Sequence, residues 1–261
     1  MRMKLYQIDA FAEKPFTGNP AAVVPLSSWI PDDLLLKIAS ENNLSETAFF
    51  VEYNNEYEIR WFTPQQEVDL CGHATLASAY VLFKHLTPDK EELIFHSKSG
   101  LLKVSRGKSD IISLNFPGRK PTKVSLEQVF IDCFNKEPLS VWKSRDYILE
   151  FSDESDVIGL QPDFEAIMKL DSLGLIVTAK GDKYDFVSRF FAPRAGIPED
   201  PVTGSAHSTL IPFWSERLNK RDLTAYQCSA RGGELICKNI GDRVIISGKA
   251  IQYLEGTIEI Y

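Results

Sequence analysis

Short segments rich in branched and aromatic residues alternate with turn residues along most of the chain, a pattern that predicts many β-strands. The predicted strands of the first half are 4–11, 46–52, 57–62, 93–95, 101–105 and 111–116. Those of the second half are 139–142, 147–151, 173–179, 186–192, 225–228, 234–237, 243–247 and 252–261. Strands therefore dominate the expected fold.

Two predicted helices, 74–86 and 206–218, stand out because they have almost no polar face. A helix that is apolar on nearly every side must be buried, so we expect each of them to be surrounded by strands. More ordinary helices are predicted at 31–42, 125–134 and 164–170. The polar cluster at 153–156 is interpreted as a solvated turn.

Both apolar helices follow a glycine, in the segments LCGHAT at 70–75 and VTGSAH at 202–207. We interpret this repetition as an old duplication in which each half is a sheet curled around one buried helix. The stretch 117–121 contains two prolines and a glycine and is the best linker candidate. The expected domains are therefore 1–116 and 117–261, with final strands that may cross back to the first half.

Composition excludes several classes of partner. The net charge of -7 leaves no basic stripe for nucleic acid. The most apolar stretch is far too short to cross a bilayer, and the first residues do not form a signal peptide, so we expect a soluble, cytoplasmic protein. The four cysteines form no C-x-x-C pair and are interpreted as reduced thiols.

Familiar cofactor and metal motifs are absent from the sequence. It has neither a glycine-rich nucleotide-binding motif nor a zinc protease or serine hydrolase motif, and its four histidines do not have metal-ligand spacing. We therefore expect no cofactor and no metal.

The two glycine-led helix starts are candidate anion sites. A helix N-terminus has unpaired backbone N–H groups and a partial positive charge, and Gly72 and Gly204 lack the side chain that would keep a ligand away. If the halves are related by pseudo-twofold symmetry, both starts can face one cleft and bind a carboxylate. The alternative is that each glycine only permits a sharp turn from strand to helix.

Several sequence blocks carry a resemblance to a known family. The blocks are DAF at 9–11, FTGNPAAV at 16–23, LSETAF at 44–49, DLCGHAT at 69–75 and EDPVTGSA at 199–206, with a weaker match at RGG, 231–233. In this order they resemble the PhzF family of isomerases, named for an enzyme of phenazine biosynthesis. The resemblance implies an α+β fold like that of diaminopimelate epimerase: two pseudo-symmetric halves, each a curled, mostly antiparallel sheet around a central buried helix.

The resemblance also implies the site residues. It makes Glu46 the general acid/base, places His73 and Asp200 against the substrate, and assigns donors to it at Gly72 and Ser205, beside Gly204. A glutamate can accept and return a proton if partial burial raises its pKa, and the residues around Glu46 are apolar. Without the resemblance, Glu46 reads as a surface carboxylate, His73 as a capping or core residue, and Asp200 as a turn or cap residue.

The expected function is a cofactor-independent isomerisation that moves a proton between carbons of a small, cyclic or unsaturated carboxylated metabolite. A racemase or epimerase on the same fold, and a non-catalytic binding protein, remain alternatives. Diaminopimelate epimerase has a cysteine before the glycine of each half, but here Cys71 is matched by Thr203, whose hydroxyl is too weak an acid. This difference favours one proton carrier, Glu46. The resemblance also implies a homodimer.

Overall fold

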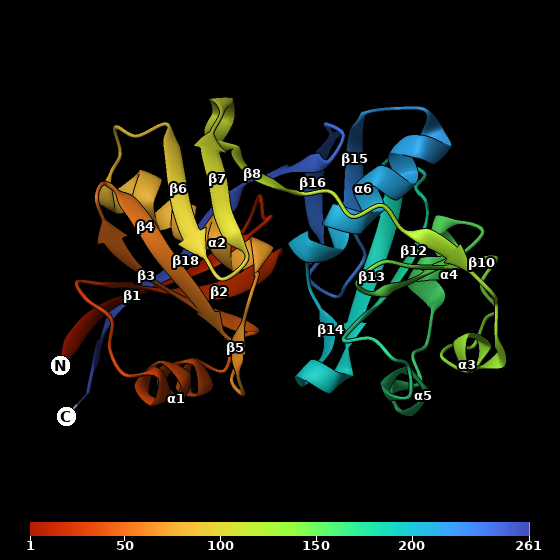
Figure 1. Ribbon diagram of the computed structural model, residues 1–261, viewed down its shortest axis with the longest axis horizontal. Helices are drawn as coiled ribbons and strands as arrows, with labels where there is room; N and C mark the ends of the chain where they lie inside the picture. The colour runs from red at the N-terminus through yellow and green to blue at the C-terminus, as the bar shows by residue number, and fades with distance from the viewer. Residues whose placement is uncertain (261) are drawn as a thin grey trace. The chain divides into compact units, whose positions relative to one another are not determined.

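The computed structural model describes residues 1–260, which form two compact units (Figure 1). The first unit contains residues 1–116 and 247–260, and the second contains Pro117–Ile246. The last residue of the strand predicted at 252–261, Tyr261, lies outside the described residues. No helix in the described part of the chain is both long and apolar enough to cross a membrane.

The first unit is a mixed, mostly antiparallel sheet. Its strands are β1 (Arg2–Ala10), β2 (Asn19–Leu26), β3 (Glu46–Tyr53), β4 (Glu56–Phe62), β5 (Glu67–Val68), β6 (Glu92–Ser97), β7 (Gly100–Arg106), β8 (Ile112–Pro117) and β18 (Ala250–Glu259). They pair in the order β18-β1-β2-β3-β4-β6-β7-β8, with the short β5 also on β4. The β2–β3 and β4–β6 pairs are parallel and the others are antiparallel. Helix α1 (Asp32–Asn42) and a 3-10 turn, η2 (Lys108–Asp110), complete this unit with the central helix.

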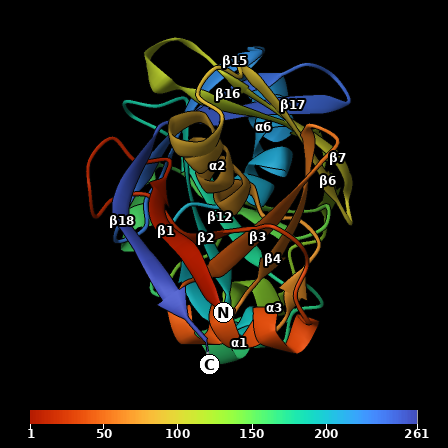
Figure 2. The same ribbon diagram turned by 90° about the vertical axis from the view of Figure 1, so that its left-hand side faces the viewer.

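The central helix of the first unit is α2 (Gly72–Val81), which continues as a π-helix, η1 (Leu82–Leu86). Figure 2 shows α2 among the strands, with β1, β2 and β18 on one side and β6 and β7 on the other. Every residue of α2 except Tyr80 is buried. The prediction that the apolar helix 74–86 is enclosed by strands is confirmed for residues 74–83, whereas Lys84, His85 and Leu86 are exposed.

The second unit repeats this arrangement. Its strands are β9 (Thr122–Val124), β10 (Ser140–Lys143), β11 (Tyr147–Glu150), β12 (Leu175–Lys180), β13 (Phe186–Ala192), β14 (Ile197–Asp200), β15 (Asp222–Gln227), β16 (Gly233–Asn239) and β17 (Arg243–Gly248). Its helices are α3 (Gln128–Ile131), α4 (Glu154–Gly159), α5 (Phe164–Met168), a 3-10 turn η3 (Pro193–Ala195) and the central α6 (Gly204–Leu218), which is buried from Ala206 to Ser215.

The strands of the two units pair in the same order, although the strand on β1, β18, comes from the end of the chain and the strand on β10, β9, comes just before it. In the second unit β11–β12 and β13–β15 are the parallel pairs, as β2–β3 and β4–β6 are in the first. Along the chain, each central helix follows a short strand, β5 or β14, that pairs with the strand before it, β4 or β13. Each helix is followed by a longer strand, β6 or β15. The shared order of parallel and antiparallel pairs supports an internal duplication.

A proline in the middle of α6 is compensated by the chain that enters the second unit. Pro212 has no N–H, so the carbonyl of Ser208, one turn earlier, loses its usual helical donor. The backbone N–H of Arg119 donates to this carbonyl over 2.8 Å. The predicted linker 117–121 is therefore attached to the middle of the central helix by a hydrogen bond.

Some elements differ from the sequence-based expectation. The strand β2 was not predicted, because Pro20 and Pro25 lie within it and proline disfavours strands. The cluster predicted as a solvated turn begins helix α4, where the Asp153 side chain accepts a hydrogen bond from the Asp156 N–H. The helix predicted at 125–134 shrinks to the four residues of α3. These errors concern short or proline-containing elements, where local patterns are weak.

A buried histidine lies inside the second unit. His207, on α6, hydrogen-bonds through Nδ1 to the Thr203 carbonyl over 2.8 Å, and its ring centroid lies 5.8 Å from that of Phe186. Burial lowers the pKa of His207 to about 4, although the bond to Thr203 opposes the shift. The ring is therefore neutral at pH 7.

We expect His207 to make stability fall as the solution is acidified. Below pH 6.5 the unfolded chain gains a proton on this ring that the folded chain does not take up until about pH 4. Between pH 7 and pH 5 this effect removes about 2 kcal/mol of the free energy of unfolding. Urea unfolding at both pH values measures it. The difference between the two pH values should shrink by that amount in His207→Gln. An unchanged difference in His207→Gln would contradict the assignment.

Candidate functional site

Glu46 is the first residue of β3, and its side chain is 13% exposed. Helix α1 comes before this strand. It ends at Asn43, whose left-handed backbone (φ 49°) stops the helix. Leu44 and Ser45 then bring the chain into β3, where Glu46 lies beside Ala21 of β2 in the parallel ladder. The carboxylate is thus held by a strand with neighbours on both sides, in surroundings that are largely buried.

His73 is the second residue of α2, and its side chain is 4% exposed. The chain is extended at Cys71 (φ -136°) and turns into the helix at Gly72, so the His73 ring points back toward the strands. Its Nε2 atom lies 3.2 Å from Oε2 of Glu46. The structure therefore brings together Glu46, Gly72 and His73, which are three of the predicted site residues.

Burial lowers the pKa of His73 to about 3. The imidazole is therefore neutral at physiological pH, and its contact with Glu46 joins a neutral ring to a carboxyl group.

Asn19 is a further polar residue at this position, and sequence reasoning assigned it no role. Its Nδ2 lies 3.1 Å from Nδ1 of His73, and its Oδ1 accepts a hydrogen bond from the Ser45 hydroxyl over 3.0 Å. Asn19 is fully buried at the start of β2. Its place in the block FTGNPAAV could have marked Asn19 as a site residue. Its contact with His73, 54 positions away, could not have been predicted from the sequence.

Gly18 explains why the chain can place Asn19 there. Its φ is +68°, and a Cβ on this residue would lie 2.2 Å from the carbonyl oxygen of Ala10. Only glycine fits such a close approach between β1 and the start of β2.

Glu46, Cys71 and His73 form a group whose possible ligand atoms lie within 4.8 Å of one another, the one such group found among residues 1–260. Cys71 Sγ, however, is 3.5 Å from Nδ1 of His73, whereas Glu46 is next to Nε2. One nitrogen of an imidazole coordinates a given metal ion. An ion bound by Glu46 and by Nε2 of His73 would therefore lie on the opposite side of the ring from the Cys71 thiol, which is next to Nδ1. The donor set therefore fits a hydrogen-bonded cluster better than a tetrahedral metal site.

The second unit has its own polar cluster at the start of α6. Asp200, 6% exposed at the end of β14, accepts a hydrogen bond through Oδ2 from the Thr203 hydroxyl over 2.5 Å. Gln227 accepts from the Thr203 N–H over 2.8 Å and donates to the Asp200 carbonyl over 2.7 Å. These bonds hold the turn that leads into Gly204, so Asp200 has the turn-forming role that local sequence suggested.

The N-termini of α2 and α6 share a property that suits an anion. Neither Cys71 nor Thr203 caps its helix with its side chain, and the first turn of each helix contains no acidic residue. Neither helix therefore offsets the partial positive charge within its own first turn, although the Asp200 carboxylate lies beside the start of α6.

Ser205, the second residue of α6, lies next to an arginine that sequence reasoning did not identify. Arg145 Nη2 donates to Ser205 Oγ over 3.2 Å and is 2.7 Å from Oδ2 of Asp146. Asp146 is buried and also accepts from the N–H of Gly174 over 3.2 Å. A fixed carboxylate thus holds a guanidinium beside the predicted substrate-binding hydroxyl.

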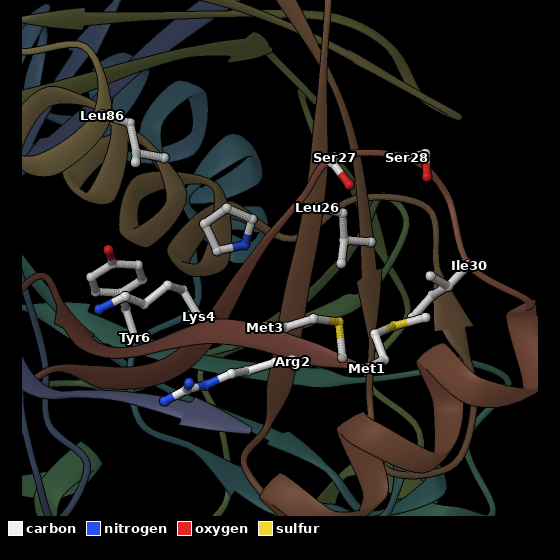
Figure 3. A pocket seen from close by; sticks show the side chains of 11 residues that line it. Met1, Arg2, Met3, Lys4, Tyr6, Leu26, Ser27, Ser28, Ile30 and Leu86 are labelled. Atoms are coloured by element: carbon white, nitrogen blue, oxygen red, sulfur yellow. The ribbon is translucent and has the colours of Figure 1, made fainter. Parts of the chain in front are cut away.

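A separate pocket in the first unit contains none of the predicted site residues. It has a volume of about 370 Å³ and lies where the start of β1 meets the far end of β2 (Figure 3). Its lining is largely apolar, with Met1, Met3, Leu26, Ile30 and Leu86. Glu46 pairs with Ala21, near the opposite end of β2.

Comparison with known proteins identifies the family. The model of the family described as phenazine biosynthesis-like protein, PhzC-PhzF, matches residues 8–256. Two uncharacterized isomerases of Pseudomonas aeruginosa are 46% and 48% identical to the chain, each over the whole length of both proteins. The crystal structure of a PhzF family protein from Enterococcus faecalis has a TM-score of 0.96 and 46% identity, and covers 100% of both chains.

More distant structures share the fold alone. A hydroxyproline epimerase from Agrobacterium vitis has a TM-score of 0.63 at 10% identity and covers 98% of this chain and 92% of its own. The predicted epimerase-like α+β fold is therefore confirmed, as is the family resemblance noted in the sequence. The chain belongs to the PhzC-PhzF family of phenazine biosynthesis-like proteins and is a PhzF-like isomerase.

Proposed function

We propose that this isomerase moves a proton between two carbons of a small, cyclic or unsaturated carboxylic acid, with Glu46 as the group that carries the proton. In the first step a C–H bond breaks, its electron pair enters the conjugated system of the substrate, and the proton passes to the Glu46 carboxylate. In the second step the same proton, or one exchanged with water, forms a bond to a different carbon. The charge on Glu46 is the same before and after the reaction.

The observation that carries this proposal is the contact between Glu46 and neutral His73 at the start of α2. A general base needs to be held in place and partly shielded from water, and Glu46 is both. The uncapped start of α2, in the same unit as Glu46, supplies positive potential that suits a substrate carboxylate.

Comparing the two units supports a single proton carrier. In the first unit Trp61 pairs with Val68, which comes four residues before the glycine that starts α2. In the second unit Phe190 pairs with Asp200, which comes four residues before the glycine that starts α6. Trp61 and Phe190 therefore occupy equivalent positions.

The equivalence extends to the neighbouring strands. Ala48 pairs with Trp61 and Ile176 with Phe190, so Glu46, two residues before Ala48, corresponds to Gly174. A Cβ on Gly174 would lie 2.1 Å from a ring carbon of Phe190. The second unit thus has no room for any side chain at the position equivalent to Glu46.

This asymmetry argues against a racemase or epimerase. Inverting a carbon centre requires a base on one face and an acid on the other, and a duplicated fold supplies them from equivalent positions. Here neither the position of Glu46 nor that of Cys71 has an acidic counterpart in the second unit, where Gly174 and Thr203 are found.

Assembly into a homodimer and a cytoplasmic location remain predictions from the family resemblance and the composition.

We expect Glu46→Gln to lower turnover by a factor of about 10³, since this amide cannot accept the proton. Cys71→Ala, a matched change in the same cluster, should keep most of the activity. Cyclic and unsaturated carboxylic acids bearing amino or hydroxy groups are first screened by thermal shift. Each ligand found is then incubated in D2O, and NMR follows product formation and the exchange of carbon-bound hydrogen.

Activity that survives in Glu46→Gln but is lost in Cys71→Ala would reverse the assignment and favour the racemase. A protein that binds ligands from this set but neither exchanges nor converts any of them would favour the non-catalytic alternative.

Arg145→Gln should weaken binding of such a carboxylic acid about tenfold, because the guanidinium and the Ser205 hydroxyl it contacts would no longer act together on the anion. Isothermal titration calorimetry measures the dissociation constant at low and high salt, and the salt dependence should be weaker in the variant. Lys183→Gln, which removes an exposed positive charge elsewhere in the second unit, is the control. Equal affinities in the two variants would show that Arg145 does not contact the ligand.

A further inference from the structure

We propose that Asn19 is a positioning residue that holds His73 as the tautomer with its proton on Nε2, facing Glu46. This inference rests on the proposed function, in which Glu46 is an ionised carboxylate before the reaction, but the tautomer can be measured without any ligand. His73 then acts as a hydrogen-bond donor at the site and not as a second base.

The first step concerns the number of protons on the ring. Burial keeps His73 neutral well below physiological pH, so the ring carries one N–H and one bare nitrogen. Its titratable neighbours in the first unit are Glu46, next to Nε2, and Cys71, next to Nδ1. The question is which nitrogen has the proton.

The position of Glu46 favours a proton on Nε2, the tautomer that the Asn19 amide holds. The proposed function makes Glu46 an ionised carboxylate before the reaction; such a group only accepts hydrogen bonds, and its Oε2 is 3.2 Å from Nε2. A bare Nε2 would place two electron-rich atoms against each other in a buried site. With the proton on Nε2, the two groups attract.

The remaining contacts agree with this choice. A bare Nδ1 accepts a hydrogen bond, and the amide Nδ2 of Asn19 is 3.1 Å from it. With Nδ2 facing His73, Asn19 Oδ1 faces Ser45, whose hydroxyl donates to it over 3.0 Å. The donors of Ser45 and Asn19 then point the same way, toward His73, and the ring proton lies on the side of Oε2 of Glu46, which is 3.2 Å from Nε2 but outside hydrogen-bond geometry.

The reverse arrangement needs a different protonation state. If the Asn19 amide were turned over, its oxygen would accept from Nδ1–H, and bare Nε2 would face Glu46. That ring is stable only beside a protonated carboxyl group. The backbone of Asn19 is held by the β1–β2 ladder, in which Asn19 pairs with Ala10. The position of its side-chain amide next to Nδ1 of His73 is therefore fixed.

The consequence is a division of labour between His73 and Glu46. The lone pair of His73 is occupied by the Asn19 amide, so the ring cannot take a proton from carbon. Its N–H can stabilise negative charge, first on Glu46 and then on the substrate when Glu46 has accepted the proton. Of these two residues, only Glu46 can therefore accept the proton that leaves the substrate carbon.

NMR of protein labelled with ¹⁵N at histidine tests the tautomer without any ligand. The two neutral tautomers and the imidazolium give different long-range correlations between ring nitrogens and ring protons. The signals of His73 are those missing from His73→Gln. In the wild-type protein between pH 6 and pH 8 we expect a neutral ring with its proton on Nε2. A proton on Nδ1, or a charged ring, would overturn the proposal.

Variants of Asn19 test the cause. In Asn19→Asp the carboxylate can only accept, so the proton of His73 should move to Nδ1 or the ring should become charged. Asn54→Asp, the same change in an exposed turn, should leave His73 as it is. Ser45→Ala is a milder change that removes the hydroxyl donating to Asn19 Oδ1, and it should raise the population of the tautomer with its proton on Nδ1. If the Asn19 variant does not fold, the wild-type and Ser45→Ala spectra decide, and an unchanged tautomer in every folded variant refutes the role of Asn19.

Activity measurements separate this inference from the proposed function. If Glu46→Gln remains active while the wild-type ring carries its proton on Nε2 and responds to Asn19, the proposed function fails and the tautomer assignment stands. If Glu46→Gln is inactive and the ring carries its proton on Nδ1, the proposed function stands and Asn19 does not set the tautomer.

Discussion

A helix that is buried along its length still has N–H groups in its first turn for which the helix itself has no acceptor. In this protein both central helices face that constraint, and neither is capped by the side chain of the preceding residue. Polar groups gather near both helix starts, in otherwise apolar surroundings. At the start of α2 they are Glu46, His73 and Asn19, and at the start of α6 they are Asp200, Thr203 and Ser205.

How much of this could be read from the sequence depends on how local each signal is. The enclosed helices were predictable because the absence of a polar face leaves no other location for them. The strand β2 was not, since Pro20 and Pro25 obscure a segment whose strand character comes from pairing with β1 and β3. Family blocks placed Glu46 and His73 among the candidates, and the structure brings these two together.

The residues that sequence reasoning missed act through contacts between distant parts of the chain. Asn19 meets His73 across 54 positions, and Arg145 meets Ser205 across 60. A single sequence contains no trace of such pairings, because each partner has an ordinary local role as a strand or turn residue. The duplicated framework is thus readable from periodicity, whereas the polar contacts that distinguish one unit from the other are not.

The last strand of the first unit has a consequence for how the protein is made. The strand β18 pairs with β1 over its length, yet it is synthesised after the whole second unit, which is continuous from Pro117 to Ile246. During translation the second unit therefore has all its strands available before the first unit does. The earlier-made half must wait with β1 unpaired on one edge, which is a template for wrong pairing, until residues 250–259 leave the ribosome. The N-terminal half of the chain is the last to become complete.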